Sequence, residues 1–158
     1  MSPESSVIQK PSRPSRLWLW ASALLALAGI GVSAYLSAKR LSGGSLVCTR
    51  WAQCDTVNNS VYAVMYGVPV AFLGLAGYLA LLVLALIALT SNGTAQRRVL
   101  LVSFLLALGG VGFSLYLTYL ELYVIHAVCS WCVASAIIIT LLMLFAARSV
   151  YTAFNAGR

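Results

Sequence analysis

Long apolar runs, separated by short polar segments, make up most of the chain. Four runs are about 20 residues long or slightly longer, which is the length that an α-helix needs to cross a bilayer. Their predicted limits are 17–37, 67–90, 99–123 and 129–150. Because the runs are continuously apolar rather than alternating, and because backbone groups in hydrocarbon need partners within their own segment, helices are predicted and barrel strands are not.

The remaining segments complete a predicted domain plan. Residues 1–16, rich in Ser, Pro and Arg, are typical of a disordered tail, and 151–158 form a short second tail. Asp55–Tyr66 mixes apolar and polar side chains in a pattern that suits a short amphipathic helix lying in the membrane interface. The predicted fold class is therefore an all-α integral membrane domain over 17–150. It is a four-helix bundle with an interfacial helix in its first outer loop.

The composition agrees with a membrane protein. The chain has 158 residues, of which 61% are hydrophobic and 8% charged. A soluble domain of this size has too little interior to bury so much apolar surface. The net charge of +7 needs no nucleic-acid partner, because basic flanks of membrane spans set orientation and attract anionic lipid.

The distribution of Lys and Arg predicts the orientation. Seven basic residues flank the spans on one side and three on the other. The seven are Lys10, Arg13, Arg16, Arg97, Arg98, Arg148 and Arg158, and the three are Lys39, Arg40 and Arg50. The positive-inside rule then places both termini in the cytoplasm and both cysteine-containing loops outside the plasma (inner) membrane. A cleaved signal peptide over the first run is the alternative, but the run is long enough for a retained anchor.

The four cysteines form two pairs, which the parity of the spans places on the same face. Cys48 and Cys54 lie in the loop after the first span. Cys129 and Cys132 form a Cys-x-x-Cys motif at the start of the fourth. A helix N-terminus stabilises a thiolate and makes a disulfide there more oxidising. Two dithiol couples on one oxidising face therefore indicate an electron relay.

Two other roles for the cysteines stay open on spacing alone. Both pairs could be static disulfides that only stabilise a small membrane protein. All four could instead ligate one zinc ion, although the step from Cys48 to Cys54 is longer than usual zinc spacing and exposed zinc thiolates suit an oxidising compartment poorly. The Cys-x-x-Cys at a helix start favours redox exchange over both.

Two ionisable residues near Cys129 have competing interpretations. His126 could favour the Cys129 thiolate as a cation, but a water-exposed interfacial histidine is the simpler expectation. Glu121 is the only acid within a predicted span. Acids in membranes often serve functions such as proton relay, but Glu121 is near the outer end, and we expect its side chain to extend to water.

The cysteines and their neighbours resemble the vitamin K epoxide reductase family, and its bacterial members most closely. The pattern comprises Cys48, Cys54, Ser60, the stretch Gly67-Val68-Pro69-Val70-Ala71 with Gly74, and the motif Cys129-x-x-Cys132. The resemblance implies a four-helix bundle with a quinone, either ubiquinone or menaquinone, held beside the Cys-x-x-Cys. Cys132 would face this quinone. Ser60 would donate a hydrogen bond to it or support a lid, the segment Asp55–Tyr66 that could cover the outer end of the bundle. Trp131, inside the motif, could also cover the quinone.

The resemblance further implies a route for electrons. Cys48 would meet a thioredoxin-like (DsbA-like) protein, Cys54 would exchange with Cys129, and Cys132 would deliver electrons to the quinone. The expected activity is that of a quinone-dependent thiol-disulfide oxidoreductase of the disulfide-forming pathway. A DsbB-like oxidase is the alternative, but there the Cys-x-x-Cys precedes the spaced pair, which is the reverse of the order here.

Two departures from the family pattern narrow this expectation. Many bacterial members carry a fused thioredoxin-like domain, whereas this chain ends at Arg158 without one, so a separate partner is expected. Vitamin-K-reducing animal members have a tyrosine four residues after the last active-site cysteine, where this chain has Ala136. Plain quinone reduction is therefore expected rather than epoxide reduction.

Overall fold

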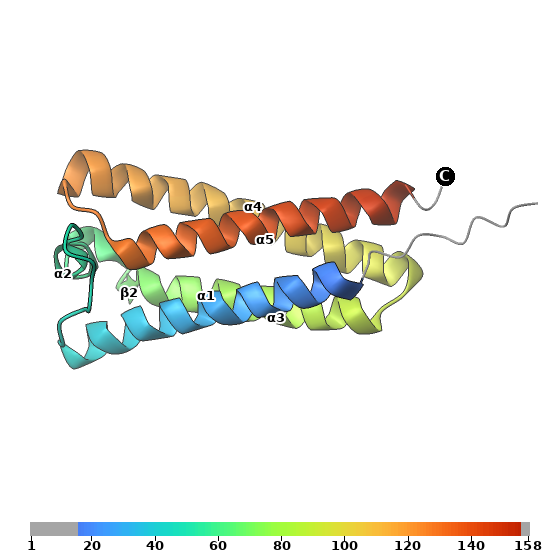
Figure 1. Ribbon diagram of the computed structural model, residues 1–158, viewed down its shortest axis with the longest axis horizontal. Helices are drawn as coiled ribbons and strands as arrows, with labels where there is room; N and C mark the ends of the chain where they lie inside the picture. Colours follow the sequence, from blue (N-terminus) through green and yellow to red (C-terminus); the bar gives the residue numbers. More distant parts are fainter. Residues whose placement is uncertain (1–15, 156–158) are drawn as a thin grey trace, which may run out of the picture.

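Four long helices form the protein in the computed structural model, which describes residues 16–155. They are α1 (Arg16–Ser42), α3 (Val70–Thr90), α4 (Gly93–Leu120) and α5 (Ser130–Asn155), and they run along one common direction (Figure 1). All four are long and apolar enough to cross a membrane. The 21 residues of α3 extend over about 32 Å at 1.5 Å per residue, close to the thickness of a bilayer's hydrocarbon core. The predicted four-helix membrane bundle is confirmed.

Several helices extend past the predicted spans. The first continues to Ser42 and the last to Asn155, so the part of the predicted tail 151–158 that the structure describes continues α5. The predicted tail 1–16 lies outside the described residues except for Arg16. Helical geometry does not end where the hydrocarbon core ends, so these helices can project into the interface.

Small residues allow close packing at the centre of the bundle. Ala26 and Ala107 are fully buried there. Gly29 lies so close to the ring of Tyr78 that any β-carbon would overlap it. Such contacts bring helices together where lipid provides no hydrophobic driving force for association. Many leucines face outward instead, where lipid solvates them.

The segment between α1 and α3 contains only short elements. Helix α2 (Cys54–Asn58) is followed by the 3-10 turn η1 (Val61–Ala63) and by a hairpin of β1 (Val64–Met65) and β2 (Val68–Pro69). The predicted amphipathic helix over Asp55–Tyr66 is thus shorter than expected. Its first part is α2, which ends where Ser60 takes an extended conformation and its hydroxyl donates to the Val57 carbonyl at 2.8 Å. Asn and Ser favour such turns over continued helix.

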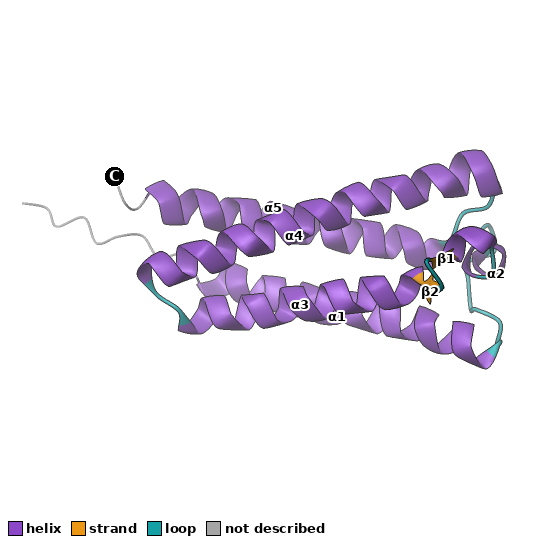
Figure 2. Cartoon of the chain, turned by 180° about the vertical axis from the view of Figure 1, so that it is seen from behind, coloured by secondary structure: helices purple, strands orange, loops and turns teal. Residues whose placement is uncertain are grey.

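Both cysteine-containing segments lie at the same end of the bundle. Figure 2 shows α2 and the β1–β2 hairpin at that end, together with the connection from α4 to α5. Helix α1 begins and α5 ends at the other end (Figure 1). There Arg97 lies over Phe154 and Arg148 over Trp18, with guanidinium-to-centroid distances of 5.6 and 5.3 Å. The parity argument for the cysteines is confirmed by this arrangement, while the side of the membrane stays a prediction.

Candidate functional site

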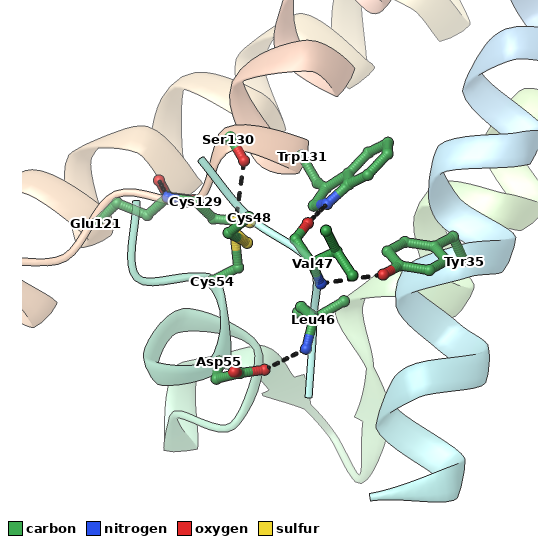
Figure 3. Close-up of a disulfide and its surroundings, with 10 residues drawn as sticks. All are labelled: Tyr35, Leu46, Val47, Cys48, Cys54, Asp55, Glu121, Cys129, Ser130 and Trp131. Atoms are coloured by element: carbon green, nitrogen blue, oxygen red, sulfur yellow. Dashed lines mark hydrogen bonds between the residues drawn. A yellow bond between two sulfur atoms is a disulfide. The ribbon is translucent and has the colours of Figure 1, made fainter. Parts of the chain in front are cut away.

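The loop that leads to α2 is attached to the segment that leads into α5. The backbone N–H of Gln53 donates to the Val128 carbonyl at 2.9 Å, and the Trp131 indole N–H donates to the Val47 carbonyl at 2.9 Å. Tyr35 of α1 contacts both partners of the second bond. Its hydroxyl accepts the Val47 N–H at 3.1 Å, and its ring packs on Trp131 with centroids 4.9 Å apart (Figure 3). These contacts hold the two cysteine-containing segments together.

Cys48 and Cys54 form a disulfide with Cα atoms 6.3 Å apart. Cys54 begins α2 and is only 1% exposed, whereas Cys48 is partly exposed. The Asp55 carboxylate accepts the N–H of Leu46 at 2.7 Å and so fixes the stretch before Cys48 (Figure 3). The disulfide therefore presents Cys48, and not Cys54, on its accessible side.

Cys129 and Cys132 are free thiols at the start of α5. Cys129 directly precedes the helix and is fully buried, and its carbonyl accepts the N–H of Val133 at 3.1 Å. It belongs to the same buried cluster as Cys54, whose sulfur lies 3.5 Å from the Ser130 hydroxyl. The predicted neighbours Cys54 and Cys129 are thus brought together.

A cavity of about 420 Å³ lies inside the bundle next to Cys132. Its wall is mostly apolar and comes from α1, α3, α4 and α5, with α2 and η1 contributing at the outer end. Gly77 and Gly109 enlarge it, since a β-carbon at either position would meet no atom within 4 Å. Volume and lining are typical of a small-molecule site. A planar quinone ring, apolar except for its carbonyl oxygens, fits this wall.

Ser60 and Trp131, both predicted to lie beside a quinone, are placed differently with respect to the cavity. Ser60 lines the cavity, but its hydroxyl proton is engaged by the Val57 carbonyl, which favours support of the lid over donation to a ligand. Trp131 is not among the lining residues. The structure gives Trp131 a contact with the first loop instead, and cover of a quinone by its ring stays a prediction.

Glu121 is the site residue that sequence reasoning placed wrongly. It was expected to extend to water, yet it is only 5% exposed and lines the cavity with Cys132. It begins the π-helical turn η2 (Glu121–Ile125), after which the exposed His126 takes a left-handed conformation with φ 55°. The Glu121 carbonyl accepts the N–H of Ala127 at 3.0 Å, and its carboxylate Oε2 accepts the N–H of Cys129 at 3.1 Å. The turn thus folds the chain back over the carboxyl group.

The sequence did contain one signal that Glu121 belongs to the site, namely that it is an acid. A single acid in an apolar span, eight residues before a Cys-x-x-Cys, is a candidate functional group because burying a charge is costly. His126, in contrast, is exposed as expected.

A comparison with protein families agrees with this geometry. A model of the vitamin K epoxide reductase family matches residues 20–147, which include all four cysteines, Ser60 and Glu121. Members are membrane thiol-disulfide oxidoreductases that in general use a quinone and work with a thioredoxin-like partner.

Proposed function

This chain belongs to the vitamin K epoxide reductase family, and we propose that it passes electrons from a separate thioredoxin-like protein to a membrane quinone. The partner gains a disulfide in the process. One observation carries the proposal: Cys54 and Cys129 are buried in one cluster, and Cys132 lies in the wall of an apolar cavity. Electrons that enter at the loop pair therefore have a short route to the cavity.

The relay begins at Cys48. A partner thiolate attacks its sulfur, the Cys48–Cys54 bond breaks, and Cys54 leaves as a thiolate. At this stage the inner pair, Cys129 and Cys132, is oxidised to a disulfide. Cys54 then attacks Cys129, and Cys132 leaves as a thiolate. The partner's second thiol displaces Cys48, which displaces Cys129 and restores the Cys48–Cys54 disulfide. Both electrons then reside on the Cys129/Cys132 dithiol, the arrangement present in the structure.

The cavity wall supplies the binding surface at the end of this route. A bound quinone would accept two electrons and two protons, which returns the inner pair to a disulfide. Leu81, Leu105 and Phe113 are among the apolar residues that would hold the ring, and Ser60 would stabilise the lid above it. Ala136, in place of the tyrosine of vitamin-K-reducing members, favours a quinone over an epoxide as substrate.

Anaerobic reduction of the purified protein followed by quinone addition tests the proposal. The quinone absorbance should fall in proportion to the protein dithiol, and the thiols of Cys129 and Cys132 should disappear. A static disulfide would resist mild reductant, and a zinc site would need thiolates that the Cys48–Cys54 disulfide has removed. Failure of the reduced protein to transfer electrons to any membrane quinone would overturn the proposal.

The orientation has its own test. We propose that both cysteine-containing loops face the periplasm or cell exterior, since seven of the ten basic residues flank the opposite ends of the spans. A membrane-impermeant thiol reagent, applied to intact cells after reduction, should label Cys48. Labelling of Cys48 only after lysis would show that the cysteine-containing loops face the cytoplasm.

A further inference from the structure

Glu121 has a buried carboxyl group that the disulfide relay itself does not use. It lies in the cavity wall with Cys132, and its side chain is 5% exposed. In the described part of the chain, no Lys, Arg or His lines this cavity, and Glu121 is its only acid. A carboxyl group in such a place needs an explanation, because an unpaired buried charge is strongly unfavourable.

A structural role alone does not require an acid. Glu121 Oε2 accepts the backbone N–H of Cys129 at 3.1 Å. A glutamine carbonyl at this position would accept the same bond without the cost of burying a charge. The feature that an amide cannot provide is the ability to take up and release a proton.

The inner cysteine pair needs such a group when it is oxidised. Conversion of the Cys129/Cys132 dithiol to a disulfide breaks two S–H bonds, forms one S–S bond and releases two electrons and two protons. Cys129 is fully buried, so its proton has no direct path to water. Glu121 is placed beside both cysteines, since it accepts the backbone N–H of Cys129 at 3.1 Å and lines the same cavity as Cys132. It also faces the cavity in which the electrons are delivered.

We propose that Glu121 is the proton-transfer residue of the inner pair, an inference that rests on the proposed function. The carboxylate takes the Cys132 thiol proton as the S–S bond forms and releases it into the cavity toward the quinone oxygens. The Cys129 proton follows the same route, which returns Glu121 to its carboxylate form. The quinone receives both electrons and both protons, so the reaction balances without a further reagent. The π-helical turn η2 keeps the carboxyl at the cavity, as such turns often do at functional sites.

Glu121→Gln separates proton transfer from structure, because the amide can keep the hydrogen bond to Cys129. Quinone-dependent oxidation of the inner pair should slow on the order of 100-fold, the usual size of a general acid–base contribution. Glu121→Asp keeps a carboxyl group and should recover part of the rate. Asp55→Asn is the matched control for the alkylation measurement below. It makes the same acid-to-amide change at Asp55, an exposed residue and the only other acid in the described part of the chain.

A second readout needs no quinone. In reduced, quinone-free protein, the alkylation rate of Cys132 is followed against pH by mass spectrometry. The titratable groups that contact Glu121 or share its cavity are Cys129, Cys132, Tyr62 and Tyr78. If the Glu121 carboxyl and the Cys132 thiol share a proton, they titrate as a pair. The plot of Cys132 alkylation rate against pH should then show two coupled steps in wild-type protein and in Asp55→Asn. Glu121→Gln should lose one step, and Glu121→Asp should retain it.

The outcomes distinguish this inference from the proposed function. If wild-type protein reduces quinone and Glu121→Gln matches it in both oxidation rate and alkylation profile, Glu121 is only a structural acceptor and the inference is wrong. If wild-type protein shows the coupled profile but reduces no quinone, the proposed function fails while the shared proton stands. If Glu121→Gln does not fold, the Glu121→Asp profile decides, since loss of coupled steps there overturns the inference.

Discussion

Cys48 and Cys54 lie six residues apart in a loop, whereas Cys129 and Cys132 lie three apart at the start of a helix. The loop pair is held by hydrogen bonds from neighbouring segments, such as that from Trp131 to the Val47 carbonyl. The helix pair is fixed by the first turn of α5, and its second member, Cys132, borders the cavity. The loop therefore presents Cys48 to the outside of the protein, whereas the helix presents Cys132 to the cavity inside it.

We propose that this difference gives the two pairs different tasks. Within each pair, one cysteine is buried and belongs to the shared cluster, namely Cys54 and Cys129. The other cysteine of each pair has its own environment, the exterior for Cys48 and the cavity for Cys132. Exchange between pairs is therefore expected at the buried cysteines, and exchange with other molecules at the remaining two.

The largest expected effect comes from Cys132→Ala. It removes the only cysteine in the described cavity wall, so quinone reduction should be abolished while Cys129 remains available to pair with Cys54. Non-reducing electrophoresis with peptide mapping should reveal a trapped Cys54–Cys129 disulfide. A trapped Cys48–Cys129 disulfide would show that the order of the loop pair is inverted.

Cys48→Ala should divide the two tasks. Transfer from a thioredoxin-like protein should be lost, because the accessible sulfur is gone. Quinone reduction driven by a small dithiol should persist, since such a molecule can enter the cavity and reach Cys132, which is partly exposed, without the loop disulfide. Equal loss of both activities in a folded Cys48→Ala protein would contradict separate tasks for the pairs.

Trp131→Phe tests the hydrogen bonding that holds the loop pair in place. It removes the N–H donated to Val47 but retains a ring against Tyr35, and should cost about 1 kcal/mol of stability for one hydrogen bond. Thermal unfolding measures the loss, and the partner-driven rate should fall more than the rate with a small dithiol. Trp51→Phe, at an exposed position in the same loop, is the control and should change neither.

The smallest effect is expected from Ser60→Ala. Loss of its hydrogen bond to Val57 should loosen the lid and weaken quinone binding by about 0.5 to 1 kcal/mol. Quinone titration by tryptophan fluorescence measures the change, with Ser45→Ala at an exposed loop position as the control. A loss of quinone affinity well above about 1 kcal/mol would indicate direct contact between Ser60 and the quinone.

Much of the fold could be predicted because its signals are local. A run of apolar residues as long as a bilayer is thick must form a helix wherever it occurs, and parity then places 48–54 and 129–132 at the same end. The nature and spacing of the cysteines predicted redox chemistry in the same way. Even the end of α2 follows from the turn-forming Asn58, Asn59 and Ser60.

The positions of Glu121 and Trp131 were decided only by tertiary structure. On a regular helix near the membrane surface, Glu121 could reach water, but the π-helical turn and the left-handed His126 fold the chain back so that Cys129 donates to the carboxylate. Trp131 likewise meets Val47, a residue 84 positions away in the sequence. Such contacts depend on segments that the bundle brings together from distant parts of the chain. Hydropathy and spacing along one segment carry no information about the direction in which a side chain then points.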